Sequence, residues 1–436
     1  MSENKKKNMT NRVVSNSAWI IAERLIQAGI SFFIQIATIN YLEPQSWGEI
    51  SYCSAFVNVF LCLSALGLEY IVIKELTAQP EEKNVIMGTA MGMRLISGLL
   101  SVGTMVFLVG ATKKFETGYM LIALLISLQL IFRLSDLIDF YFQSRLESKL
   151  VSLAKGITYA IVACWKIFIL ATNKPKEYFA FSYALDAIVI CIILLYLFFK
   201  HAKPQLRFSF TWAKRLLHQS KHFILASMIT MVYSEMDRLM LGNICGETEV
   251  AVYTTAYSIA MVWVFIPNAI MTSYRPAIME GHATGTNYLE RLRTLYSIII
   301  WIGIVAGIGV MVCGRWFFAT FYDEFYLASV PSLYLLIWST LFSHLAVSRS
   351  TWLVCEGLNH YSELFPIWGV IVNLVLNFLL IPKLGATGAS AATLTTQFVV
   401  TMIAPLFYKP TRPCVGHMCQ AFFAKDLIDR VKGLKK

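Results

Sequence analysis

About twelve apolar segments, each long enough to cross a bilayer, constrain the fold of this 436-residue chain more than any other feature. A helix that spans a membrane needs about 20 mostly apolar residues. The predicted spans cover residues 14–41, 46–69, 85–111, 117–142, 150–171, 177–199, 220–243, 249–273, 294–318, 327–353, 361–381 and 386–408. Only 14% of the residues are charged, against about 25% in soluble domains. We therefore predict an all-α polytopic membrane protein.

The basic residues are distributed unevenly between the two sides of the predicted membrane. With twelve spans and a cytoplasmic N-terminus, 24 of the 37 lysines and arginines fall in cytoplasmic segments and 6 in outer loops. Cytoplasmic loops of membrane proteins carry such an excess, so both termini are predicted to be cytoplasmic. This topology explains the net charge of +11 without nucleic acid as a partner. No secretory signal peptide is recognisable, because the first apolar stretch is too long.

The longest internal polar break, Lys200 to Lys221, divides the chain into two halves. The predicted units are an N-terminal six-helix lobe (1–200), a cytoplasmic linker (201–220), a C-terminal six-helix lobe (221–410) and a cytoplasmic basic tail (411–436). The halves are weakly similar in sequence, although shared hairpin chemistry can produce the same likeness. Transporters are often built from two related bundles with the substrate site between them. We expect two pseudo-symmetric lobes around a central cavity.

A polar stripe runs along the first predicted span. Its members follow each other at helical steps of three or four and share one face: Arg24, Gln27, Ser31, Gln35 and Thr38. A charge inside a membrane helix costs at least about 2.5 kcal/mol, so the stripe faces water or another helix. One interpretation is the wall of a hydrophilic path. The alternative is a packed helix contact in which Glu23 pairs with Arg24.

Further charged residues lie in the fourth and seventh predicted spans. Arg133 and Asp136 are one turn apart, so they are expected to pair. Glu235 and Arg238 are also one turn apart, with Asp237 beside them. Arginine stays charged when desolvated and donates two parallel hydrogen bonds to phosphate oxygens. A carboxylate can instead exchange a proton or hold sodium.

No enzyme, nucleotide or metal signature accompanies these residues. The nine cysteines form no C-x-x-C pair, and the chain contains no Walker A, H-E-x-x-H, G-x-S-x-G or Rossmann motif. No cofactor or metal is therefore expected. Transport would draw on an ion gradient, with protons or sodium, on the membrane potential or on the substrate gradient.

Three blocks of residues resemble a known family. They are Asn16, Trp19, Arg24, Leu42, Trp47-Gly48, Gly67 and Lys74-Glu75-Leu76; Asp237-Arg238, Gly242, Gly246, Val250, Tyr253, Ala256 and Pro276; and Gly357, Asn373, Asn377, Ile381-Pro382, Gly385, Gly388-Ala389, Ala391 and Thr393. The chain resembles the polysaccharide flippases, for O-antigen and capsule units, of the multidrug/oligosaccharidyl-lipid/polysaccharide exporter superfamily. Trp47, where the family more often has Phe, and Ala251, where it more often has Gly, are departures that do not touch the charged residues.

The resemblance implies two lobes in a V and alternating access, in the inner membrane of a bacterium. The implied cargo is an undecaprenyl-pyrophosphate-linked oligosaccharide, and membrane lipids, a polysaccharide polymerase and a chain-length regulator are candidate partners. The candidate substrate-binding residues are Arg24, Gln27, Ser31, Gln35, Arg133 and Arg238. The candidate ion-coupling residues are Asp237, Glu235 and Asp136. The family pattern favours Arg24, Asp237 and Arg238 over Arg133.

Three alternative functions remain open from the sequence. A multidrug or organic-cation antiporter of the same superfamily would need an acidic cavity, against which Arg24 and Arg133 argue. A lipid II flippase keeps the mechanism and changes the sugar. A membrane-embedded polysaccharide enzyme is disfavoured by the short outer loops and the missing catalytic motifs.

Overall fold

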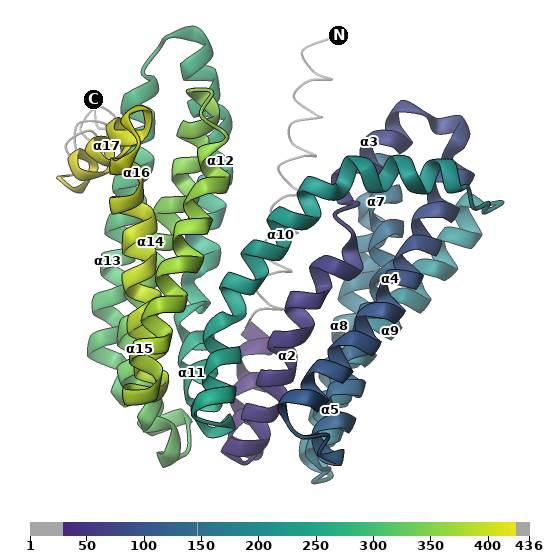
Figure 1. Cartoon of the computed structure of the whole chain (residues 1–436), viewed down its shortest axis with the longest axis horizontal. Coiled ribbons are helices and arrows are strands. Elements are labelled where there is room, and N and C mark those ends of the chain that lie inside the picture. Colours follow the sequence, from purple (N-terminus) through teal and green to yellow (C-terminus); the bar gives the residue numbers. More distant parts are fainter. Residues whose placement is uncertain (1–28, 146, 424–436) are drawn as a thin grey trace, which may run out of the picture.

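The computed structural model describes residues 29–145 and 147–423, which form helices joined by turns and loops, with no β-strand among them. The N-terminal arm consists of residues 29–41, α2 (Pro44–Ala65), α3 (Glu69–Ala78), α4 (Lys83–Thr112), α5 (Thr117–Ser127), α6 (Gln129–Phe132), η2 (Arg133–Ser135), α7 (Asp136–Ser144), α8 (Ser148–Ala171) and α9 (Lys176–Ala202). The C-terminal arm consists of α10 (Phe210–Ile244), α11 (Glu247–Ala260), α12 (Phe265–Thr284), α13 (Tyr288–Phe321), η4 (Glu324–Ser329), α14 (Val330–Cys355), α15 (Tyr361–Phe398), η5 (Val399–Ile403), α16 (Ala404–Phe407) and α17 (Arg412–Phe422). The two arms diverge as a V (Figure 1).

Nine helical segments of the described chain are long and apolar enough to cross a membrane, which confirms an all-α polytopic membrane protein. The difference from twelve predicted spans has three sources. Only residues 29–41 of the first predicted span are described. The helix α10 is long enough but carries charged residues along its length. The segment Tyr361–Phe407 holds two predicted spans, separated where the backbone of Gly385 leaves the helical conformation (φ 53°, ψ −131°).

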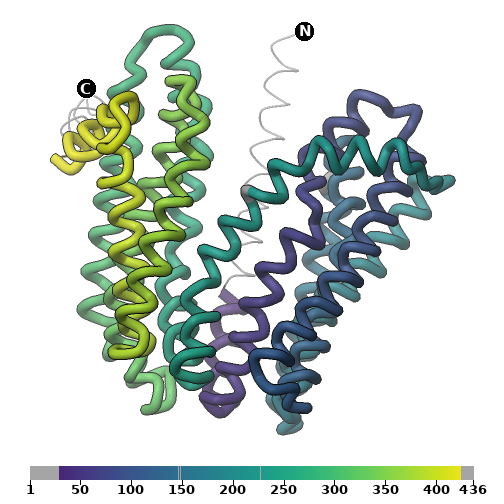
Figure 2. The backbone as a smooth tube through the Cα atoms, in the orientation of Figure 1, coloured from purple at the N-terminus to yellow at the C-terminus, as the bar shows by residue number. Residues whose placement is uncertain are grey.

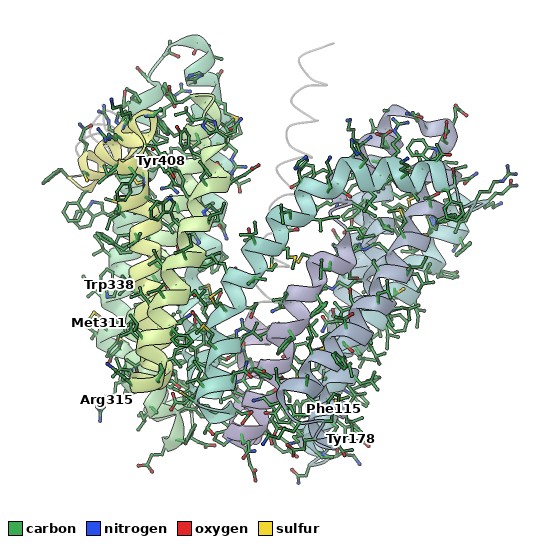
Figure 3. The ribbon with its side chains drawn as sticks, viewed as in Figure 1. Phe115, Tyr178, Met311, Arg315, Trp338 and Tyr408 are labelled. Carbon is green, nitrogen blue, oxygen red and sulfur yellow. The ribbon has the colours of Figure 1, made fainter. Side chains whose placement is uncertain are left out.

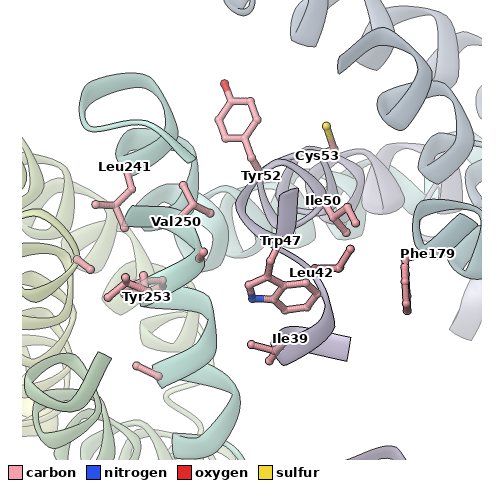
Figure 4. Packing of buried hydrophobic residues seen from close by; sticks show 14 of the residues in the cluster. Ile39, Leu42, Trp47, Ile50, Tyr52, Cys53, Phe179, Leu241, Val250 and Tyr253 are labelled. Carbon is pink, nitrogen blue, oxygen red and sulfur yellow. The ribbon is translucent and has the colours of Figure 1, made fainter. Parts of the chain in front are cut away.

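The buried apolar side chains form one core shared by both arms and two cores that belong to one arm each. The shared core lies at the closed end of the V, where Trp47 and Tyr52 of α2 belong to the same cluster as Leu241, Val250 and Tyr253 of α10 and α11 (Figure 4). The second core lies in the N-terminal arm and includes Trp212 and Leu216 from the first turns of α10, and the third core lies within the C-terminal arm. Each arm therefore has its own packed interior and meets the other at one end.

The arms touch most closely where α2 packs against α11. A Cβ atom at Gly48 would lie 1.9 Å from the carbonyl oxygen of Glu247, so only glycine permits this contact. Lys113, which follows α4, donates to a carboxylate oxygen of Glu247 at 2.7 Å and to the carbonyl oxygen of Gly242 at 2.6 Å. An ion pair and a close backbone contact thus hold the closed end together.

The helix α10, counted above with the C-terminal arm, also packs on the N-terminal arm. It begins at Phe210, so the second half of the predicted linker 201–220 is helical. Its first turns pack on the N-terminal arm, where Arg215 pairs with Glu75 at 2.9 Å. Its later turns pack against α2 and α15, and the tube in Figure 2 shows α10 running from one arm to the closed end.

Small residues set the spacing of the long helices in the C-terminal arm. Gly303 and Gly307 of α13 face Leu341 and Trp338 of α14, and a Cβ atom would lie 2.5 Å and 2.9 Å from those side chains. Close helix contacts through glycine are typical of membrane proteins. Trp338 lies in the middle of this arm (Figure 3).

The beginning of the predicted tail 411–436 is also helical. The helix α17 packs against α13, and Ser297 donates to the carbonyl oxygen of Ala421 at 2.6 Å.

We predict that Gly48→Ala pushes the arms apart at the closed end, because the added methyl group has no room beside the backbone of α11. Overpacking of this kind costs about 1–3 kcal/mol. Spin labels at the exposed positions Glu116 and Glu324, one on each arm, would report a longer or broader distance. Gly103→Ala is the matched control, since open space surrounds that position in α4. An unchanged distance in Gly48→Ala would contradict this account of the contact.

Candidate functional site

Two adjoining cavities lie near the closed end. The central cavity, between the arms, has a volume of about 370 Å³ and is lined by Gln35, Trp47, Ser51, Ser54, Asn58, Gln129, Tyr183, Arg238, Thr254, Tyr257, Ser258 and Met261. The N-arm pocket, inside the N-terminal arm, has a volume of about 250 Å³ and is lined by Ser31, Ile34, Gln35, Thr38, Trp47, Ile50, Tyr159, Val162, Ala163, Lys166, Phe179 and Tyr183. The two share Gln35, Trp47 and Tyr183, so they are contiguous.

Arg238 supplies the positive charge in the lining of the central cavity. Its guanidinium group pairs with Glu235, one turn earlier on α10, at 3.2 Å. The other carboxylate oxygen of Glu235 accepts from Asn58 of α2 at 2.9 Å, and the guanidinium group lies 5.5 Å from the ring centre of Tyr257. Arginine has five N–H donors in all. The pair with Glu235 therefore leaves donors that can bind an anion.

The rest of the central cavity is polar and joins the arms. Gln35 donates to the hydroxyl oxygen of Ser258 on α11 at 2.8 Å. The indole nitrogen of Trp47 and the hydroxyl of Thr254 are buried and have no hydrogen-bond partner among the residues that the structure describes. A buried polar group without a partner costs about 1–3 kcal/mol. Such groups are suited to binding the hydroxyl groups of a ligand.

The carboxylate of Asp237 lies inside the C-terminal arm, away from the central cavity. One oxygen accepts from the hydroxyls of Tyr253, at 2.6 Å, and of Thr393. The other accepts from the side-chain amides of Asn377, at 2.7 Å, and Asn373, at 3.2 Å. Asp237 is 4% exposed, and no cationic side chain of residues 29–145 or 147–423 pairs with it. Four neutral donors thus hold a buried carboxylate.

The surroundings of Asp237 are rich in oxygen atoms. The amide oxygen of Asn377 is buried and has no partner within the described chain. The hydroxyl of Thr393, which donates to the other carboxylate oxygen, also lies 3.1 Å from the carbonyl oxygen of Ala389. Carboxylate, amide, hydroxyl and carbonyl oxygens are the ligands of hard cations. The residues present therefore fit either a small cation or a proton on Asp237.

The structure brings some of the predicted site residues together. Ser31 and Gln35 both line the N-arm pocket, and Ser31 donates to the hydroxyl oxygen of Tyr159 at 3.2 Å. Arg238 and Glu235 meet at the central cavity. The carboxylate of Asp237, which directly precedes Arg238 in the sequence, points into the C-terminal arm. Arg24 and Gln27, together with the pairing proposed for Glu23, lie outside the described residues.

Two predicted site residues lie elsewhere in the N-terminal arm. Arg133 and Asp136 line neither cavity. The expected pair between them does not form, because Asp136 pairs with Arg94 of α4 at 3.5 Å. Arg94 is 3% exposed, whereas Arg133 is half-buried. The more deeply buried arginine pairs with the carboxylate, since an unpaired buried charge is costly.

Sequence reasoning missed four residues that the cavities bring forward: Trp47, Asn58, Lys166 and Tyr257. Asn58 is a single amide in an apolar stretch of α2, which is a signal for a polar contact. Lys166 and the predicted residue Arg238 both face cavities. Trp47 and Tyr257 look like interface anchors in the sequence, so no pattern separates them from others.

A family model described as polysaccharide biosynthesis protein matches residues 13–282, which is more than half of the chain. The chain belongs to this family. A second model, MatE, matches residues 223–379. The family predicted from the three residue blocks is thus confirmed.

Individual relatives and solved structures support the same placement. The chain is 26% identical over 203 residues to a probable low-salt glycan biosynthesis flippase of Haloferax volcanii, a match that covers 45% of this chain and 42% of the relative. The curated relatives are thus matched over less than half of their length. The fold is similar to that of the lipid II flippase MurJ in an inward closed conformation (TM-score 0.75, 11% identity, 94% of this chain and 91% of that one). It is also similar to an inward-facing multidrug resistance MATE transporter (TM-score 0.70, 13% identity, 92% and 99%).

We predict that Arg238→Met destabilises the protein by about 3 kcal/mol, because it leaves the buried carboxylate of Glu235 without its partner. The double variant Arg238→Met/Glu235→Gln should lose less than Arg238→Met alone. Unfolding in detergent with a chemical denaturant measures both. Lys155→Met is the control, since Lys155 is 57% exposed where it pairs with Asp139, and it should cost less than about 1 kcal/mol. A double variant that loses as much stability as Arg238→Met alone, or more, would contradict the pairing.

Proposed function

We propose that this protein is a flippase that moves an undecaprenyl-pyrophosphate-linked oligosaccharide, of the O-antigen repeat-unit type, from the inner to the outer leaflet of a bacterial inner membrane. The main observation behind the proposal is a cavity between the two arms with polar residues and the guanidinium group of Arg238 in its wall. Membership of the polysaccharide biosynthesis protein family supports the substrate class. The Haloferax volcanii relative, a probable glycan biosynthesis flippase, supports the reaction.

The open end of the V is proposed to face the cytoplasm. The link between α9 and α10 and the helix α17 lie at this end (Figure 1). Basic residues gather there, among them Lys200, Lys203, Arg207 and Arg412. An excess of lysine and arginine is typical of cytoplasmic segments. In this orientation both termini are cytoplasmic and the cavities open toward the leaflet where lipid-linked sugars are made.

The cavity offers a cargo two kinds of contact. The pyrophosphate would bind arginine, with Arg238 and, outside the described residues, Arg24 as its donors. The sugar hydroxyls would bind polar groups such as Gln35, Trp47 and Thr254. Release to the other leaflet requires the arms to separate at the closed end and approach at the open end. The pair between Lys113 and Glu247 must then break, since it joins the arms at the closed end.

Asp237 is proposed to couple transport to protons or sodium. The carboxylate is buried among neutral donors. It must therefore be protonated, bind a cation, or be stabilised as an anion by those donors alone. Asp237 is followed directly by Arg238 on α10, which connects the ion site to the cavity wall. Glu235 is the second candidate. A proton or cation on its carboxylate would weaken the pair with Arg238 and leave the guanidinium group available to the cargo. Asp136 is a weaker candidate, since it already pairs with Arg94.

A multidrug antiporter is the second candidate, favoured by the MatE match over residues 223–379. An organic cation would need negative charge in the cavity. The central cavity carries Arg238 in its lining and the N-arm pocket carries Lys166, which favours an anionic cargo instead. A lipid II flippase is compatible with the same geometry. A polysaccharide polymerase and a chain-length regulator remain proposed partners.

We predict that Arg238→Gln and Arg24→Ala each lower translocation of a pyrophosphate-linked oligosaccharide at least roughly tenfold, as expected for the loss of a charged hydrogen bond. Transport by purified protein in liposomes measures this. Arg315→Gln is the control, because Arg315 is exposed at the rim of the C-terminal arm (Figure 3). Undiminished transport by either cavity variant, at equal protein level, would contradict the role given to that arginine.

We predict that Asp237→Asn abolishes the response of the protein to its coupling ion. A ligand that binds the folded state stabilises it by about 2.7 kcal/mol at a hundred times its dissociation constant. Thermal unfolding at rising sodium should shift to higher temperature for the natural protein and stay unchanged for Asp237→Asn. Asp139→Asn is the control, because Asp139 is a mostly buried carboxylate that pairs with the exposed Lys155. An Asp237→Asn protein that keeps the natural response would show that the ion binds elsewhere.

A further inference from the structure

Lys166 is a cation in the N-arm pocket that the proposed transport mechanism leaves unused. Its ammonium group lies 5.8 Å from the ring centre of Tyr183. Asp186, on the neighbouring helix, attracts it electrostatically, yet Lys166 forms no ion pair within residues 29–145 and 147–423. Arg94, Lys155 and Arg238 each pair with a carboxylate. The charge of Lys166 is therefore less compensated than theirs and remains available to an anion.

The walls of the N-arm pocket combine hydrogen-bonding groups with aromatic rings. Ser31, Gln35 and Tyr159 contribute hydroxyl and amide groups, while Trp47 and Phe179 contribute aromatic faces. Ligand pockets use a few placed polar groups for orientation and apolar surface for contact. A volume of about 250 Å³ is below the range typical of drug-sized ligands. The pocket therefore suits a small polar unit, such as one sugar ring, with a negative charge for Lys166.

The position of the pocket decides which part of a cargo can reach it. Lys166 is five residues before the end of α8 at Ala171. That end lies at the closed end of the V, because the carbonyl oxygen of Lys174 accepts from Tyr41 and Lys176 pairs with Glu49 of α2. A cargo that enters from the open end brings its sugars to this depth. The pocket is contiguous with the central cavity, so a cargo whose pyrophosphate lies at Arg238 can place a neighbouring sugar in it.

We propose that the N-arm pocket binds an acidic sugar of the cargo, with the ammonium group of Lys166 on its carboxylate. The inference rests on the proposed flippase function and narrows its substrate class to glycans that carry an acidic residue. The aromatic rings of Trp47 and Phe179 pack against the sugar ring. Ser31 and Gln35 bind its hydroxyl groups.

The test compares three probes that differ in their anionic groups. They are prenyl pyrophosphate alone, prenyl pyrophosphate linked to glucose, and prenyl pyrophosphate linked to glucuronic acid. Dissociation constants are measured with the purified full-length protein by thermophoresis. The natural protein should bind the glucuronic acid probe roughly tenfold more tightly than the glucose probe, the factor expected for one charged hydrogen bond.

Two variants of Lys166 and one control complete the experiment. Lys166→Gln should lose the preference for glucuronic acid and keep its affinity for the other two probes, which also shows that it is folded. Lys166→Arg should retain most of the preference. Lys155→Gln, which removes a mostly exposed lysine of the same helix, should behave as the natural protein.

Three results would overturn the proposal. Equal binding of the glucose and glucuronic acid probes by the natural protein would refute the acidic-sugar site alone. Weaker binding of all three probes by both Lys166 variants would assign Lys166 to the pyrophosphate or to folding. No binding of any probe by the natural protein would refute the proposed flippase function as well.

Discussion

The close contact between α2 and α11 is the constraint on which the arrangement of the two arms depends. Gly48 lets the helices meet with backbone against backbone, and the pair between Lys113 and Glu247 adds charge to that contact. Because each arm also has its own core, the arms do not need each other to stay packed at the open end. The shared core at the closed end therefore determines where the cavities lie. Both cavities lie beside it and include Trp47, which belongs to that core.

The charged groups inside the helices are satisfied in different ways, and the difference separates groups that pack within one arm from the groups of the candidate site. Arg94 pairs with Asp136, and Arg349 donates to the carbonyl oxygens of Val400 and Thr401 at the π-helical η5. These groups support the packing of one arm. Asp237 accepts hydrogen bonds from neutral donors. Arg238 pairs with Glu235 at the cavity wall, and Lys166 lies near the ring of Tyr183.

Much of this architecture could be predicted from the sequence, because apolar length and helical spacing are local properties. Within the described residues each predicted span overlaps a helix, although α10 begins ten residues before its predicted span and α12 ends eleven residues after its own. The stripe through Ser31 and Gln35 does line a pocket. The partners of each charge could not be predicted, since they depend on contacts between distant helices. Thus Arg94 takes the carboxylate assigned to Arg133, and Asn373 and Asn377 were noted only as members of a family block. Their shared role at Asp237 appears only when α15 packs against α10.

The neighbouring positions of Asp237 and Arg238 on α10 have a thermodynamic consequence. One side chain reaches into the C-terminal arm and the next into the central cavity, so the two sites are separated by a single peptide unit. A movement of α10 that changes one site must change the other. Energetic coupling between two binding sites is reciprocal. An ion at Asp237 that alters the affinity of the cavity for its cargo therefore has its own affinity altered by the cargo, by the same factor.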